Sequence, residues 1–130
     1  MADIQINAQE ITQVVVNLLV NAADAMYDRD DGIDSLIDIS LKPNGQYQRI
    51  VVADNGPGIP EHLHKEIWNP FFTTKPSGKG TGLGLAICSG IVEEHGGEIF
   101  YKNLPSGGAC FVIDLPVIDF RSSLFPDLYP

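Results

Sequence analysis

Two asparagines stand four residues apart in a segment that is otherwise almost entirely apolar. Asn17 and Asn21 lie within "VVVNLLVNAADAM", and Gln13 and Asp24 extend the same polar stripe by about one turn on either side. Residues four apart share a helix face, and Asn is a poor helix former that a solvated face ordinarily replaces with Lys or Glu. The paired amide oxygens could therefore ligate a hard cation such as Mg²⁺, and an ordinary solvated face is the alternative.

A carboxylate ends the apolar run "RIVVAD" and is followed by the loop "NGPGIP". Asp54 could accept a hydrogen bond from an amino group of a flat ligand, which Gly56 and Gly58 would allow to approach the backbone closely. The alternative is a turn in which the aspartate caps its own backbone. The residues alone leave both interpretations open.

Two aromatics, two threonines and a lysine precede a second cluster of glycines in "NPFFTTKPSGKGTGLGLAI". Lys75 could meet a phosphate as a point charge, and the N-terminus of the helix expected to open at 81–85 favours an anion. We expect Phe71 or Phe72 to dock the loop onto the domain. Neither established phosphate fingerprint is present, so a flexible turn ahead of a helix is the alternative.

These residues need a scaffold that brings distant segments together. Apolar periodicity predicts strands over 3–8, 35–41, 48–54, 97–103 and 108–116, helices over 8–26 and 83–94, and one or two helical turns over 61–68. Asn7 is the expected N-cap of the first helix. Because most strands pair with their sequence neighbours, this order predicts an α+β two-layer sandwich, in which helices cover one face of a mixed sheet.

Composition narrows the function classes. The 130 residues fit one domain, and the net charge of −9 argues against nucleic acid, which demands a basic face. No apolar run reaches membrane-spanning length, so we expect a cytoplasmic segment without membrane contact, whether or not a longer intact protein is membrane-attached. Cys88 and Cys110 have apolar neighbours and no metal-ligand spacing, so they are expected to be reduced core thiols.

Together these segments resemble the catalytic, ATP-binding domain of bacterial sensor histidine kinases. That family belongs to the superfamily of gyrase, mismatch-repair and heat-shock-chaperone ATPases with the Bergerat-type fold. Its four boxes occur in order as "NLLVNAADA", "DNGPGIP", "NPFFTTK" and "GTGLGLAI", and the lid is similar to that of nitrogen-regulation-type kinases. The resemblance implies a catalytic domain over 1–116 and leaves the tail 117–130 without a role.

The resemblance implies a role for each matching residue. Asn21 matches the asparagine that holds Mg²⁺ between the ATP phosphates, Asn17 lies on the phosphate side, and Asp54 matches the aspartate that recognises the adenine amino group. Catalytic roles are implied for Asn17, Asn21 and Lys75. Besides Asn17, Asn21 and Asp54, the positions implied to contact the nucleotide or shape its site are Asp24, Gly56, Gly58, Ile59, Phe71, Phe72, Thr73, Thr74, Lys75, Gly80, Thr81, Gly82, Leu83, Gly84 and Leu85.

Asn17 also bears on the reaction. Hydrolytic relatives carry a glutamate there as general base, and an amide cannot take a proton at neutral pH. We therefore expect little hydrolysis, and phosphoryl transfer by positioning and charge neutralisation. Asp24 departs from the basic phosphate contact of many histidine kinases, a contact that Lys75 or Lys79 could replace.

The resemblance also implies partners. His62, His64 and His95 lack the setting of a phosphoacceptor. The acceptor histidine is therefore expected on a separate dimerising helical hairpin, with a response regulator downstream, and the isolated domain is expected to be monomeric. An anti-sigma-factor-like serine kinase and a non-catalytic ATP-binding module are the alternatives.

Overall fold

The structure is a computed structural model of the whole chain, and it describes residues 7–73, 84–117 and 126–128. The elements in chain order are α1 (Ala8–Ala25), β1 (Ile37–Asn44), β2 (Tyr47–Asp54), the short 3₁₀ turns η1 (Glu61–Leu63) and η2 (Glu66–Trp68), α2 (Gly84–Glu94), β3 (Glu98–Asn103) and β4 (Ala109–Pro116). Residues 3–6 of the expected first strand lie outside the described part, and Asn7 and Ala8 already cap and open α1.

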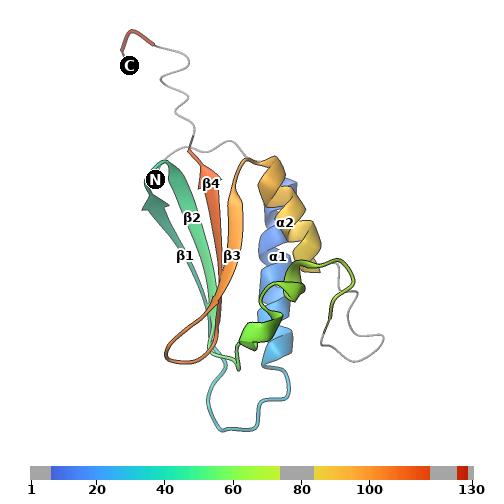
Figure 1. Cartoon of the computed structure of the whole chain (residues 1–130). Helices are drawn as coiled ribbons and strands as arrows, with labels where there is room; N and C mark the ends of the chain where they lie inside the picture. Colours follow the sequence, from blue (N-terminus) through green and yellow to red (C-terminus); the bar gives the residue numbers. More distant parts are fainter. Residues whose placement is uncertain (1–6, 74–83, 118–125, 129–130) are drawn as a thin grey trace.

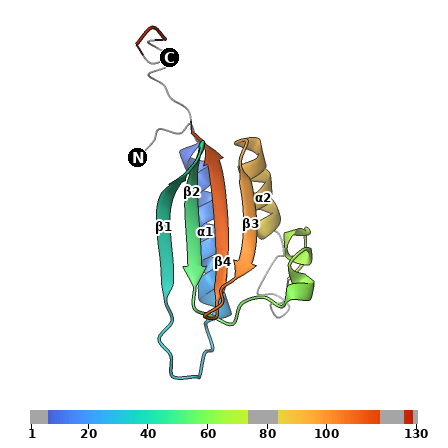
Figure 2. The same cartoon turned by 60° about the vertical axis from the view of Figure 1, so that its left-hand side comes forward.

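The four strands form one sheet in the order β1-β2-β4-β3, and α1 and α2 lie together on one of its faces (Figures 1 and 2). This arrangement confirms the predicted α+β fold with helices on one side. The three described strand pairings are all antiparallel, so the part of the sheet that the structure describes is not mixed as predicted.

The first helix begins where its sequence predicts. The side chain of Asn7 accepts a hydrogen bond from the Glu10 main-chain N–H at 3.1 Å, which confirms the expected N-cap. The buried residues of α1 recur at helical spacing, and they are Ile11, Val14, Leu18 and Ala22. Ile11, Val14 and Leu18 belong to a core to which β2 and β4 contribute Ile50, Val52, Phe111, Ile113 and Leu115.

The β1–β2 hairpin differs from its predicted limits. The strands expected over 35–41 and 48–54 leave a connection over 42–47 that contains Pro43, yet β1 continues through Pro43 to Asn44 and the chain reverses at Gly45 and Gln46. Among the described strands β1 is an edge of the sheet, where a proline costs no ladder hydrogen bond if its nitrogen faces outward. Gly45 supplies the left-handed φ of 61° that the reversal needs.

The register of the sheet fixes where the chemistry lies. Residues of β2 alternate, so Ile50, Val52 and Asp54 share the helix-covered face. Asp54 is the last residue of β2 and stands opposite Ile37 on one side and Ala109 on the other. The carboxylate therefore sits at the end of the sheet where the "NGPGIP" loop leaves it.

Candidate functional site

Asp54 is buried at the end of β2, with only 7% of its surface exposed. Its Oδ1 accepts a hydrogen bond from the Gly56 N–H at 2.8 Å. The aspartate thus caps its own turn, as one of the two sequence interpretations predicted. Because this bond occupies one carboxylate oxygen, the cap leaves the other for a ligand.

Close backbone approaches surround this carboxylate. A Cβ at Gly56 would lie 2.9 Å from Asp54 Oδ1 and 3.0 Å from Met26 Cγ, and a Cβ at Gly58 would lie 2.7 Å from Asn103 Oδ1. A Cβ at Gly108 would overlap the main-chain oxygen of Asp54. Gly108 precedes β4 and was not among the predicted site residues. The pair of glycines in "PSGGA" was the only signal of it in the sequence.

The far end of the loop is fixed to β3. The Ile59 N–H donates to Tyr101 OH at 2.9 Å and to Asn103 Oδ1 at 3.1 Å, and its carbonyl accepts from Asn103 Nδ2 at 2.9 Å. His64 Nε2 lies 2.8 Å from the same carbonyl, and its ring meets that of Tyr101 edge-on. Ile59 was a predicted site residue, whereas its anchors Tyr101 and Asn103 were not.

The polar stripe of α1 turns toward α2. Asn17 is half-buried, and its Nδ2 donates to the Cys88 Sγ at 3.7 Å. That contact excludes an ordinary solvated face for Asn17 and leaves its amide oxygen for other partners. Asn21 is half-buried one turn on, and no hydrogen bond to another described residue holds its side chain. Asp24 is exposed.

The C-terminal end of α1, where the polar stripe ends, lies beside the loop that follows Asp54. Met26 caps the C-terminal end of α1, and its side chain lies against Gly56, as the close approach to that glycine shows. The structure therefore brings the amide stripe and the carboxylate to the same end of the molecule, although 33 residues separate Asn21 from Asp54.

The predicted lid is the segment "NPFFTTKPSGKG", residues 69–80, and the structure describes it through residue 73. Its two phenylalanines differ in burial. Phe72 is half-buried and packs on the core, which confirms that one aromatic docks the loop. Phe71 is 74% exposed and has a φ of 69°, in the left-handed region. Thr73 is exposed, while Gly84 and Leu85 begin α2. Thr74, Lys75, Gly80, Thr81, Gly82 and Leu83 lie outside the described residues.

Both cysteines are buried with free thiols, as predicted. Burial raises the pKa of the Cys88 thiol, and the hydrogen bond from Asn17 partly opposes that rise. Burial also raises the pKa of Cys110, with Lys102 acting in the opposite direction. Neither thiol has the lowered pKa of a nucleophile.

The donor set suits an oxygen-seeking cation rather than a zinc ion. Within the ranges that the structure describes, no group of three His, Cys, Asp or Glu side chains could hold a metal. Mg²⁺ keeps several waters and needs few protein ligands, so one half-buried amide oxygen such as that of Asn21 fits it.

Comparison with known proteins decides the family. Residues 6–119 match the family described as histidine kinase-, DNA gyrase B-, and HSP90-like ATPase. The chain belongs to this family. The ATPase domain is 40% identical over 113 residues to the sensor histidine kinase TmoS of Ectopseudomonas mendocina, covering 85% of the chain and 11% of TmoS. It is 41% identical over 116 residues to the sensor histidine kinase ZraS of Salmonella typhimurium, covering 88% of the chain and 23% of ZraS.

Solved structures agree with that assignment. The catalytic domain of histidine kinase ThkA superposes with a TM-score of 0.74 at 38% identity, covering 88% of this chain and 70% of that one. ThkA in complex with response regulator protein TrrA gives a TM-score of 0.70 at 34% identity, over 88% and 30% of the chains. These likenesses confirm the predicted Bergerat-type fold and the resemblance to histidine kinase catalytic domains. Within the described ranges, no helix has both the length and the apolar character to cross a membrane.

Proposed function

We propose that this chain is the ATP-binding catalytic domain of a two-component sensor histidine kinase. It binds Mg-ATP and donates the γ-phosphoryl group to a histidine on a separate helical hairpin domain. The observation that carries the proposal is the buried Asp54 carboxylate, which has one oxygen left for a ligand at the end of the sheet where the amide stripe of α1 arrives. TmoS and ZraS, both sensor histidine kinases, are similar over this domain alone, so the activity of the intact protein is part of the proposal.

In this proposal the nucleotide lies along α1. Asp54 receives the adenine amino group through its second oxygen, and Gly56 and Gly58 shape the pocket around the base. The Asn21 oxygen faces the phosphates, where bound Mg²⁺ would neutralise part of their charge. Lys75 supplies a phosphate contact from the lid, and the glycines at 80, 82 and 84 allow the lid and α2 to approach closely.

Asn17 favours transfer over hydrolysis. Its Nδ2 is committed to Cys88, and an amide oxygen has no useful basicity at neutral pH. The residue can orient a phosphate or a water molecule but cannot remove a proton from that water. Catalysis then rests on positioning the γ-phosphoryl group for an incoming imidazole, which needs no general base because its nitrogen is already nucleophilic at neutral pH.

The partners of the intact system follow from the reaction class. A histidine-bearing hairpin supplies the acceptor, and the phosphoryl group then passes to a response regulator, the kind of protein with which ThkA was crystallised. We assign residues 1–116 to the catalytic domain, in the cytoplasm and monomeric in isolation, and assign no role to 117–130.

A transfer assay tests the proposal. The chain is mixed with the histidine-bearing hairpin domain of a similar sensor kinase and with ATP labelled at the γ-phosphate. Acid-labile, base-stable label on the hairpin is expected, and none on a hairpin whose histidine is replaced by glutamine. Acid-stable label on a serine of a protein partner would identify a serine kinase instead. Tight ATP binding without any transfer would reduce the chain to a binding module.

A further inference from the structure

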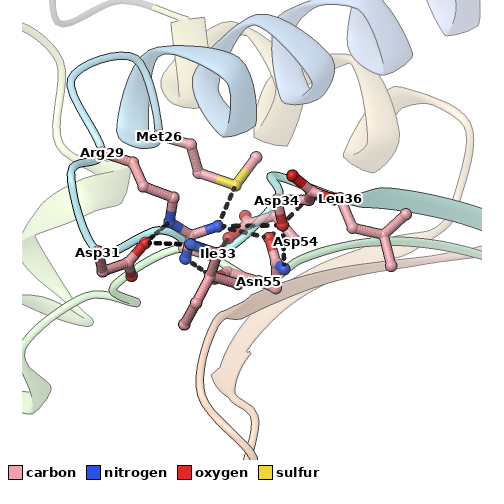
Figure 3. Close-up of polar contacts among 9 residues, drawn as sticks. Met26, Arg29, Asp31, Ile33, Asp34, Leu36, Asp54 and Asn55 are labelled. Carbon is pink, nitrogen blue, oxygen red and sulfur yellow. Dashed lines mark hydrogen bonds and ion pairs between the residues drawn. The ribbon is translucent and has the colours of Figure 1, made fainter.

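Arg29 lies in the loop between α1 and β1, outside every motif of the sequence, yet its side chain is only 13% exposed. Its guanidinium reaches the "NGPGIP" loop (Figure 3). Nη1 donates to the side-chain oxygen of Asn55 at 3.0 Å, and Nη2 donates to the main-chain carbonyl of the same residue. Nε pairs with Asp31 Oδ1 at 3.2 Å, which fixes the guanidinium from its other side.

The α1–β1 loop holds Asn55 through three further hydrogen bonds. Its N–H donates to the Leu36 carbonyl at 3.2 Å, and the Leu36 N–H donates to Asn55 Oδ1 at 2.8 Å. Asn55 Nδ2 donates to the Asp34 carbonyl at 2.9 Å. The β1–β2 pairing thus extends by one residue beyond the Ile37–Asp54 pair. Arg29 closes this network at the point where β2 becomes the loop.

The two ends of one peptide group connect Arg29 to the carboxylate. The carbonyl of Asn55 and the N–H of Gly56 belong to the same planar unit. Arg29 Nη2 binds its oxygen, and Asp54 Oδ1 binds its N–H at 2.8 Å. Rotating this peptide plane would break both bonds at once, and linked hydrogen bonds polarise and strengthen one another.

We propose that Arg29 is a positioning residue for recognition of the nucleotide base. By holding the Asn55–Gly56 peptide, it keeps Asp54 Oδ1 engaged and the second carboxylate oxygen oriented toward the amino group of the base. The inference rests on the proposed function, because it takes the Asp54 side as the base pocket. It adds a residue from the α1–β1 loop, which has no counterpart among the four boxes.

A chemical double-mutant cycle separates positioning from general stability. Calorimetry compares Mg-ATP with the Mg complex of purine riboside triphosphate, which lacks the 6-amino group. The wild-type chain should bind ATP more tightly than the analogue, because only ATP carries the amino group that Asp54 is proposed to accept. Arg29→Ala should weaken ATP binding by about tenfold and the analogue by less than about threefold, so that the preference for ATP shrinks. Arg29→Lys keeps the charge but cannot hold two oxygens in a fixed fork, so its preference for ATP should lie between that of the wild-type chain and that of Arg29→Ala.

Arg49→Ala is the matched control. Arg49 makes a two-point ion pair with Asp114, at 2.8 and 2.9 Å, on the sheet face away from the helices. Its loss should lower the melting temperature and leave both affinities unchanged. If Arg29→Ala weakens the binding of ATP and of the analogue equally, or changes neither affinity, the preference for ATP is unchanged and the positioning role is overturned. If the alanine variant does not fold, the same comparison is made with Arg29→Lys. A wild-type chain that binds ATP no better than the analogue would instead remove the proposed base pocket, and this inference with it.

Discussion

At the scale of single residues, the Asp54 carboxylate accepts the Gly56 N–H and is proposed to accept the adenine amino group, and a conservative change separates these two partners. In Asp54→Asn an amide oxygen can still accept the Gly56 N–H, so the turn is retained while the charge is lost. Binding of Mg-ATP should weaken by about 1.5–3 kcal/mol, the size of a hydrogen bond to a charged group. Calorimetry measures the change, with Asp38→Asn on exposed β1 surface as the control. Unchanged affinity in a folded Asp54→Asn would contradict the adenine assignment.

Asn21 offers a second test, because its proposed role depends on the metal. Asn21→Ala should weaken ATP binding by on the order of tenfold with Mg²⁺ present, as expected for the loss of one metal-side ligand. With the metal chelated the loss should be much smaller. Gln13→Ala removes an exposed amide from the same stripe and should change neither affinity. An equal loss with and without Mg²⁺ would show that Asn21 acts directly on the nucleotide.

At the scale of elements, the β3–β4 turn packs tightly against the end of β2, where Asp54 lies. Gly108 has a φ of 106° and no room for a Cβ, whereas Gly107 has a φ of 98° and open space around it. Gly107→Ala and Gly108→Ala therefore share the backbone strain, and only the second adds a clash with Asp54. The clash should lower the free energy of unfolding by about 1–3 kcal/mol beyond Gly107→Ala, the usual cost of overpacking.

Urea denaturation measures that difference, and ATP titration adds a second readout. Gly108→Ala should also weaken ATP binding, because relief of the clash displaces the end of β2. Gly107→Ala should leave the affinity near the wild-type value. If both variants lose the same stability, the turn does not press on Asp54 as the structure indicates.

Local patterns predicted the elements well because their causes are local. The N-cap at Asn7 and the apolar spacing of α1 lie within a few residues of each other, and so do the alternation of β2 and the glycines of its loop. Pro43 misled the hairpin limits, since only the sheet order shows that β1 is an edge among the described strands.

The supports of the candidate site could not be predicted in the same way. Asp54, Gly56, Gly58 and Ile59 follow one another in the sequence, so their loop was predicted from its own residues. Arg29, Tyr101 and Asn103 reach this loop only because the sheet register brings their segments to it, 26 to 44 residues away along the chain. Hydrophobic periodicity and turn patterns extend over fewer than about 20 residues, so they cannot predict contacts between segments this far apart.

At the scale of the whole molecule, the two thiols couple folding to pH. Cys88 is fully buried between the helices and Cys110 is buried in β4, and burial raises the pKa of each. Because the folded chain retains these protons to higher pH than the unfolded chain, stability is complete below the unfolded thiol pKa of about 8.5 and falls as pH rises above it. The structure therefore predicts an alkaline loss of stability that originates in these two side chains.

A double variant isolates this effect. Cys88→Ala with Cys110→Ala should lower stability at pH 7 by creating cavities, but the further loss between pH 8 and 9.5 should be smaller than in the wild-type chain. Urea titrations at several pH values measure both slopes. The range stops below the region where Tyr101, whose pKa burial also raises, would contribute. Equal slopes in the two chains would contradict the prediction, because they would mean that the thiolates are as well accommodated in the folded chain as in water, although Cys88 is 0% exposed and its Sγ faces the main-chain carbonyl of Val14.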